Sequence, residues 1–104
     1  MTKSRPAAKG YWVVAYRNIR DLEKLADYVH LAGPAIHAAG GRPLSRDGAI
    51  EVHEAGTRAR TVLIEFSSFD QARSAYQSPL YQTALAALGD GAVRDFRIIE
   101  GAAA

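Results

Sequence analysis

The segment at residues 10–16, GYWVVAY, restricts the fold of this chain more than any other. Its β-branched and aromatic side chains predict a β-strand. Side chains alternate along a strand, and here both faces are apolar: Tyr11, Val13 and Ala15 on one, and Trp12, Val14 and Tyr16 on the other. This pattern is typical of a strand that is buried on both sides. The fold must therefore place it inside a sheet whose two faces are covered.

Two stretches of the sequence have the pattern of amphipathic helices. The first begins after Asp21, whose side chain is a good N-cap, and ends before a pair of glycines at residues 40 and 41. Pro34 lies inside it and has no backbone N–H, so we expect the helix to kink or restart there. The second stretch begins at Ser68, another N-cap, and continues as a separate segment after Ser78-Pro79.

Four further stretches have strand patterns, at residues 42–46, 49–54, 60–66 and 96–100. Pro43 cannot donate a sheet hydrogen bond, which predicts that the first of them lies at a sheet edge. Asp47-Gly48 is a hairpin turn signal between the first and the second. We interpret the whole order as βαββαβ. This is the ferredoxin-like plan of an α+β fold, with an antiparallel sheet and the helices on one face.

The other face of this sheet also needs a cover. It carries Leu63 and one apolar set of side chains from the first strand. The simplest cover is a second copy of the chain, packed sheet against sheet about a two-fold axis. The sequence therefore predicts a homodimer through the open sheet face, in which the two sheets close a barrel-like core.

Length and cysteine content limit the class of protein. The chain has 104 residues, which fits one domain, and we place this domain at residues 10–101 between tails at residues 1–9 and 102–104. There is no cysteine, which excludes disulfides, thiolate metal sites and a cysteine nucleophile. A chain without cysteine also fits a reducing cytoplasm, which is the localisation we expect.

Charge and hydropathy bear on the expected partners. The net charge of +2 comes from arginines scattered along the chain, whereas a nucleic-acid module clusters its basic side chains on one face. No apolar stretch approaches the roughly 20 residues of a membrane span, and the first residues lack the apolar core of a signal peptide. We therefore expect no nucleic-acid partner and no membrane partner.

An ordered set of short motifs resembles the DUF1330 family across residues 10–101. The motifs are Gly10-Tyr11-Trp12, Pro34 followed by Gly40-Gly41-Arg42, Val62-x-Ile64-Glu65-Phe66, Ser68-x-x-x-Ala72-x-x-x-Tyr76-x-Ser78-Pro79-x-Tyr81, and Glu100-Gly101. The resemblance implies a dimeric α+β barrel, in agreement with the dimer argued above. It implies no activity, because the family has no generally assigned function.

Glu65 is the carboxylate of greatest chemical interest. It shares a strand face with Thr61 and Leu63, so we expect it to point toward the barrel interior or its mouth. There it could act as a general base with a raised pKa. The alternative is a salt bridge to an arginine of this chain or its dimer mate, such as Arg42, Arg60 or Arg97.

His37 is the second candidate for proton transfer. It lies near the end of the first helix, where it could move protons near neutral pH or cap the last helical carbonyls. The three histidines of the chain have no carboxylate at a metal-ligand spacing, so we expect no metal site. The sequence also lacks the glycine-rich and catalytic motifs of nucleotide and serine enzymes, so we expect no cofactor.

A set of aromatic residues could line a pocket between the helices and the sheet. Its members combine an apolar body with a polar tip, as small-ligand sites often require. We expect Arg42 to bind an anionic group of the substrate. The set is Trp12, Tyr28, Tyr76 and Tyr81. The alternative for these aromatic residues is plain core and interface packing.

Two functions remain open at this point. One is a cofactor-independent enzyme that uses Glu65 or His37 for acid–base chemistry on a small organic molecule. The other is a dimer that binds a ligand in the same pocket without chemistry, or a structural dimer whose core is filled. The sequence does not decide whether the protein is an enzyme.

Overall fold

The computed structural model describes residues 8–103, so residues 1–7 of the predicted N-terminal tail and residue 104 of the predicted C-terminal tail lie outside the described residues. The described part contains four strands and three helices. In chain order they are β1 (Gly10–Ile19), α1 (Leu22–Ala38), β2 (Arg42–Ser45), β3 (Thr61–Phe66), α2 (Phe69–Gln77), α3 (Pro79–Leu88) and β4 (Ala92–Glu100).

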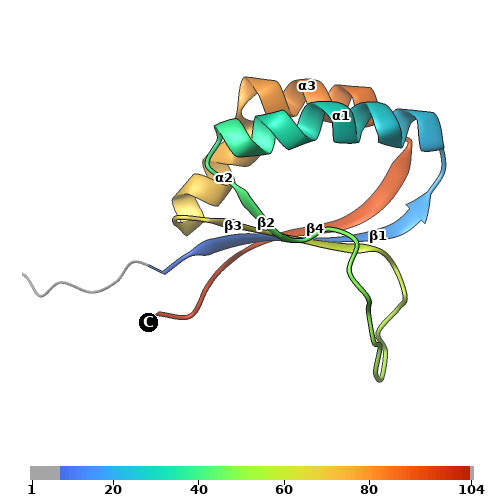
Figure 1. The fold of residues 1–104 in the computed structure, drawn as a ribbon, viewed down its shortest axis with the longest axis horizontal. Helices are drawn as coiled ribbons and strands as arrows, with labels where there is room; N and C mark the ends of the chain where they lie inside the picture. The colour runs from blue at the N-terminus through green and yellow to red at the C-terminus, as the bar shows by residue number, and fades with distance from the viewer. Residues whose placement is uncertain (1–7, 104) are drawn as a thin grey trace, which may run out of the picture.

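The strands form one antiparallel sheet in the order β2-β3-β1-β4. β1 lies inside the sheet between β3 and β4, as its two apolar faces predict, and β2 lies at an edge, as Pro43 predicts. All three helices lie on the same side of the sheet (Figure 1). The predicted α+β class and ferredoxin-like plan are therefore confirmed.

The predicted N-caps are present. The Asp21 carboxylate accepts hydrogen bonds from the backbone N–H groups of Glu23 and Lys24. The Ser68 hydroxyl accepts one from Gln71, and Ser78 begins α3 with Pro79 at the first helical position. Each cap satisfies donors that a helix N-terminus leaves without a partner.

α1 continues through Pro34 as one helix, so the predicted restart at this proline is wrong. The helix is anchored before the proline by buried Tyr28 and Ala32, and after it by buried Ile36. His30, whose carbonyl loses its partner to the proline, is exposed, so this carbonyl can bond to water instead. Packing on both sides therefore outweighs the single lost hydrogen bond.

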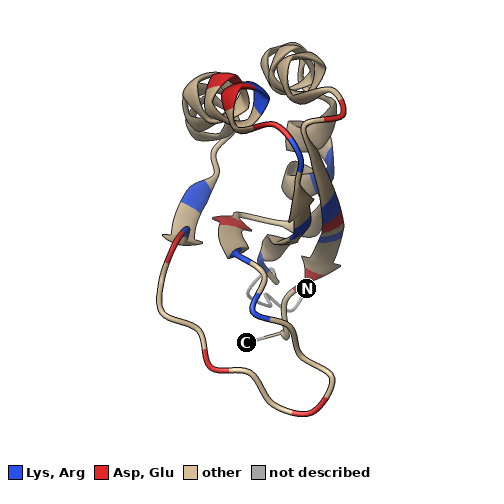
Figure 2. Ribbon diagram, turned by 90° about the vertical axis from the view of Figure 1, so that its right-hand side faces the viewer, with Lys and Arg blue, Asp and Glu red and all other residues tan. Residues whose placement is uncertain are grey.

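The predicted strand at residues 49–54 and its hairpin are also wrong. Residues 46–60 form a long loop that extends beyond the sheet on the side away from the helices (Figures 1 and 2). Its side chains are mostly exposed, Ile50 among them. Alternating side chains form a strand only where one face can pack, and this loop has no such surface within the described chain.

The core lies between the sheet and the helices, with Trp12 at its centre. The Trp12 ring is within 5.1 Å, centroid to centroid, of the rings of Phe66, Tyr81 and Phe96. Its indole N–H donates to the Ala72 carbonyl of α2 at 2.8 Å. One side chain of β1 thus joins the neighbouring strands to α2 and α3.

Candidate functional site

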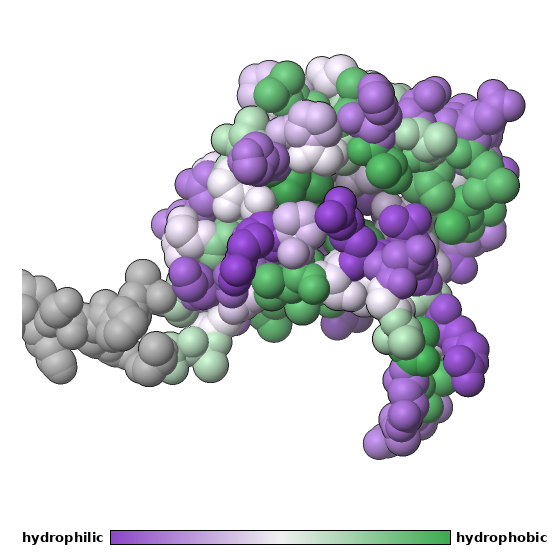
Figure 3. Space-filling view, viewed as in Figure 1, coloured by the Kyte–Doolittle hydropathy of each residue, from purple (hydrophilic) through white to green (hydrophobic). Residues whose placement is uncertain are grey.

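A pocket of about 340 Å³ lies between α1 and the helix-covered face of the sheet. Side chains that alternate along the strands form its floor, and the register places Val62, Val14 and Phe96 side by side across three strands. The space-filling view shows the surface hollowed between the helix layer and the sheet (Figure 3). A volume of this size is typical of sites for small organic molecules.

The wall of the pocket is largely apolar. α1 contributes Ala32 and Gly33, which are too short to reach across to the sheet. The rest of the apolar wall is formed by Trp12, Val14, Tyr16, Tyr28, Val29, Ile36, Pro43, Val62, Ile64 and Phe96. Because α1 packs mainly against α3, the space beneath these small residues stays open.

The charged side chains of the pocket are all basic. Arg46, Arg60 and Arg94 line it, and no Asp or Glu is among the described residues that do. Arg46 is exposed, and the other two are half-buried. Arg46 and Arg60 stand at the two ends of the long loop, whereas Arg94 projects from β4 beside Tyr16.

Arg94 is held by aromatic rings. Its guanidinium carbon lies 4.8 Å from the ring centroid of Tyr28, 5.3 Å from that of Phe96 and 5.6 Å from that of Tyr16. One of its N–H groups donates to the Tyr28 hydroxyl at 3.0 Å. These contacts stabilise the cation and fix the plane of the guanidinium.

The hydroxyls of Tyr28 and Tyr81 are hydrogen-bonded to each other at 2.7 Å. Tyr81 is fully buried, and burial raises the pKa of its hydroxyl above the usual range. Tyr81 therefore stays neutral at physiological pH and cannot act as a base there. It lies behind the wall, in contact with Trp12 and Tyr76, and does not line the pocket.

The structure separates the aromatic residues predicted to line the pocket. Trp12 and Tyr28 line it, whereas Tyr76 and Tyr81 pack in the aromatic cluster behind it. Tyr76 and Tyr81 therefore occupy core packing positions, which was the alternative to a pocket-lining role for these aromatic residues. His37 lines the pocket from the last turn of α1, with an exposed side chain.

Glu65 lies on the opposite face of the sheet from this pocket. Its carboxylate accepts hydrogen bonds from Arg42 at 2.8 Å and from the Tyr11 hydroxyl at 3.0 Å. The hydrogen bond from Arg42, followed by that from Tyr11, lowers the pKa of Glu65, so the expected raised pKa is wrong. The alternative of a salt bridge to Arg42 describes what the structure shows.

The structure therefore does not bring the predicted acid–base residues together within one subunit. Glu65 and Arg42 meet on the open face, and His37 lies across the sheet from both of them. Arg42 is engaged by Glu65 and does not line the pocket.

The ion pair between Glu65 and Arg42 predicts a specific pH dependence of stability. A carboxyl whose pKa is lowered on folding contributes stability above its unfolded pKa, and this contribution is lost as pH falls through the folded pKa. We expect the free energy of unfolding to fall as pH decreases below about 4.5. The Glu65→Gln variant should show a smaller fall, measured by urea unfolding at a series of pH values. Equal slopes in the two proteins would contradict the pairing.

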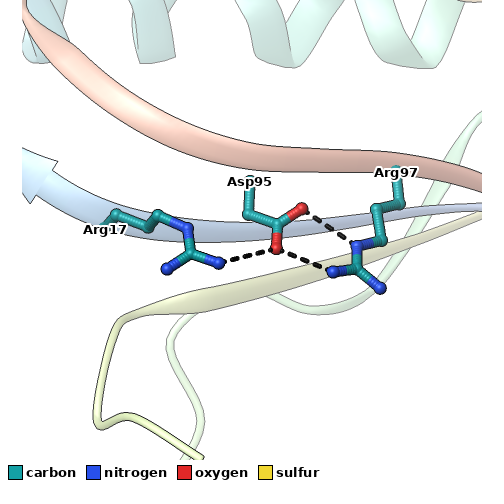
Figure 4. A network of polar contacts seen from close by, with 3 residues as sticks. All are labelled: Arg17, Asp95 and Arg97. Atoms are coloured by element: carbon teal, nitrogen blue, oxygen red, sulfur yellow. Dashed lines mark hydrogen bonds and ion pairs between the residues drawn. The ribbon is translucent and has the colours of Figure 1, made fainter.

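The open face carries a second ionic group. The Asp95 carboxylate accepts from Arg17 at 3.2 Å and from two N–H groups of Arg97 at 3.0 and 3.1 Å (Figure 4). The hydrogen bond from Arg97 is the main cause that lowers the pKa of Asp95. Asp95 and Arg97 stand opposite Ala15 and Val13 of β1, so this face alternates between charged and apolar side chains.

The three arginines of the pocket were missed by sequence reasoning. The last strand was predicted to begin at residue 96, which left Arg94 outside it, whereas β4 begins at Ala92. The signal that could have found Arg94 is its period-2 spacing from Phe96, which gives both residues the same face. Arg46 and Arg60 approach each other only through the course of the long loop, where Arg60 donates to the Arg46 carbonyl at 3.2 Å.

Metal-ligand clusters and membrane-spanning helices are both absent from the described residues. Within residues 8–103, no group of three His, Cys, Asp or Glu side chains is placed to hold a metal ion. No helix in this part of the chain is both long enough and apolar enough to cross a membrane.

Solved structures share the fold at low sequence identity. A protein of unknown function from Rhodopseudomonas palustris is 18% identical, with 93% of this chain and 83% of that chain covered and a TM-score of 0.66. A protein from Caulobacter crescentus, provisionally named an antibiotic biosynthesis monooxygenase, is 12% identical, with 94% and 93% covered and a TM-score of 0.63. At these identities the likeness supports the fold alone.

Sequence comparison identifies the family. Among curated proteins, none matches this chain significantly. The profile of the family described as a domain of unknown function (DUF1330) matches residues 9–102, nearly the whole chain. The match spans every strand and helix that builds the pocket and the open face. The chain therefore belongs to the DUF1330 family.

Proposed function

We propose that this chain binds a small organic molecule in the pocket between α1 and the sheet, and that it does so as a homodimer. The observation that carries the proposal is an unfilled, mostly apolar space of about 340 Å³. Protein interiors are otherwise close-packed, and an open space of this size loses packing contacts that a ligand would restore. The alternative of a structural dimer with a filled core has less support, because this space is open.

The dimer is proposed from the open face of the sheet. Tyr11, Val13 and Leu63 on this face are only partly exposed, but Leu44 and Ile99 are 44% and 56% exposed. A sheet with one uncovered apolar face is stabilised when a second copy covers it about a two-fold axis. The long loop extends on the same side as this face, where it could reach a second copy (Figure 1).

A neutral fluorescent probe tests the pocket. N-phenyl-1-naphthylamine has an apolar two-ring body, and Trp12, the single tryptophan of the chain, lines the pocket and can transfer energy to it. We expect saturable energy transfer in the wild-type protein. The Ala32→Phe variant places a ring in the open space and should weaken binding by about tenfold or more.

The control is Ala86→Phe, the same substitution at an exposed position of α3. This variant should bind the probe like the wild type. Equal binding by all three proteins would contradict the pocket as the site. Circular dichroism would establish that Ala32→Phe remains folded.

A cofactor-independent acid–base enzyme is the second candidate function. It is favoured by His37, whose imidazole lines the pocket and belongs to the side-chain type most often used as a general acid or base. Glu65 is less suited to proton transfer there, because it is ion-paired on the other face. For a ligand that the wild type converts, loss of turnover in a His37→Gln variant that still binds it would favour the enzyme.

A further inference from the structure

We propose that the ligand of this pocket is an organic acid, whose anionic oxygen atoms are held by Arg94 and the Tyr28 hydroxyl. This inference rests on the proposed function, because it assigns the chemical class of the molecule that the pocket binds. The apolar wall would take the body of the acid. The basic groups would take its carboxylate, sulfonate or phosphate.

The first argument is the charge of the pocket. Three arginines line it without a lining acid, and no carboxylate of the described residues lies within ion-pair distance of any of the three. The arginines elsewhere that make ion pairs are Arg17, Arg42, Arg73 and Arg97. A half-buried cation without an opposite charge is costly, and an anionic ligand would supply the missing charge.

The second argument is the hydrogen bonding of Arg94. One of its N–H groups donates to the Tyr28 hydroxyl at 3.0 Å, and the hydroxyls of Tyr16 and Tyr81 also interact with the guanidinium. A guanidinium has five N–H donors, so these three hydroxyls leave donors for a ligand. The rings of Tyr16, Tyr28 and Phe96 hold the guanidinium plane. The planar guanidinium presents pairs of N–H donors that match the two oxygens of a carboxylate. Because its plane is already held, the Arg94 side chain loses little conformational entropy when it binds one.

The third argument is the direction of the Tyr28–Tyr81 hydrogen bond. Tyr81 is fully buried, and its Oη lies 2.7 Å from Tyr28 Oη. Arg94 also interacts with the Tyr81 hydroxyl but can only donate to it, so Tyr28 is the acceptor open to the Tyr81 hydrogen. If Tyr81 donates to Tyr28, its hydrogen is satisfied, and a buried hydroxyl hydrogen without an acceptor is avoided. Tyr28 then accepts from both Tyr81 and Arg94, and its own hydrogen is left to donate into the pocket that it lines.

The groups in this corner of the pocket are therefore donors. Arg94 offers N–H groups and Tyr28 offers an O–H group, and neither offers a charged acceptor. A set of donors without an acceptor favours an oxyanion over an amine or an amide N–H. Arg46 and Arg60 add positive charge nearby, which attracts anions and raises their local concentration.

A matched pair of probes tests the inference. 8-Anilinonaphthalene-1-sulfonate and N-phenyl-1-naphthylamine share the same ring system, but only the first carries an anionic group. We expect Arg94→Met to weaken sulfonate binding by about tenfold or more, since a charge-assisted hydrogen bond is lost, and to leave binding of the neutral probe within about twofold. Added salt should weaken sulfonate binding in the wild type more than in Arg94→Met.

Two further variants complete the design. Arg97→Met removes an arginine of the same strand that faces the other side of the sheet, and it should not change binding of either probe. Tyr28→Phe removes only the hydroxyl, and it should weaken the sulfonate selectively. If Arg94→Met does not fold, Tyr28→Phe decides the question in its place.

The outcomes separate this inference from the proposed function. If the neutral probe binds in the pocket but the sulfonate shows no selective loss in Arg94→Met or Tyr28→Phe, the organic-acid assignment is overturned and the pocket stands. If both probes weaken equally in these variants, the assignment is also overturned. If neither probe binds the wild type, the proposed function fails, and the assignment fails with it.

Discussion

The Trp12→Ala variant is expected to lose about 3–5 kcal/mol of unfolding free energy. Trp12 is 1% exposed, and its ring contacts side chains from β3, α3 and β4. Alanine would leave a cavity at the centre of the core and would remove the hydrogen bond to the Ala72 carbonyl. Because a domain of this size has about 5–15 kcal/mol of stability, such a loss would remove a large fraction of the unfolding free energy.

Urea unfolding followed by circular dichroism measures this loss. Trp12→Phe is the matched control, because it keeps an aromatic ring and removes the indole N–H. It should lose less stability than Trp12→Ala. A loss below about 1 kcal/mol for Trp12→Ala would show that this side chain does not organise the core.

The Leu63→Arg variant is expected to dissociate the proposed homodimer. Leu63 stands opposite Val13 in the β1–β3 pairing, near the middle of the open face. Two-fold symmetry introduces each substitution twice, and the new arginine would join Arg42 and Arg97, which this face already carries. Burying two unpaired charges in an apolar interface should raise the dimer dissociation constant by about 100-fold or more.

Size-exclusion chromatography with light scattering measures the assembly. The wild type should have twice the mass of the 11.2 kDa chain at micromolar concentration, and Leu63→Arg should have the mass of one chain. Leu80→Arg is the control, because it makes the same substitution at an exposed position of α3, away from the open face. A monomeric wild type, or a Leu63→Arg protein that remains dimeric, would contradict the interface.

The fold could be predicted from the sequence where local chemistry and tertiary packing agree. The two apolar faces of β1 required a central strand, and Asp21, Ser68 and Ser78 marked the beginnings of helices because their side chains bond to free backbone N–H groups. Pro43 marked the edge strand because it cannot donate to a neighbour. In each case, one residue type limits the backbone directly.

The errors arose where a local pattern needed a tertiary partner. Residues 49–54 alternate like a strand, but their side chains are mostly exposed and they pair with no strand of the described chain. Pro34 is a helix breaker in isolation, yet the buried residues on either side keep α1 continuous. Neither outcome is encoded within a few residues of the position concerned.

The candidate site was predicted only in part. Strand alternation gave the correct face for Glu65, and Arg42 was among its predicted partners. Alternation could not show that this ion pair and His37 lie on opposite faces of the sheet. Arg94 was missed because its role depends on the register that sets it beside Tyr16 and on the helix that brings Tyr28 to it. Such relations appear only when distant segments are placed in space.

An NMR titration with 8-anilinonaphthalene-1-sulfonate tests the central claim most directly, because it locates the site as well as detecting binding. The claim predicts saturable shifts of backbone amide signals that cluster around the pocket, at Tyr28, Ile36, Ile64 and Arg94. The amides of Val13 and Leu63, whose side chains face the other side of the sheet, should shift much less. Shifts that centre on the open face, or that do not saturate, would contradict a ligand pocket between α1 and the sheet.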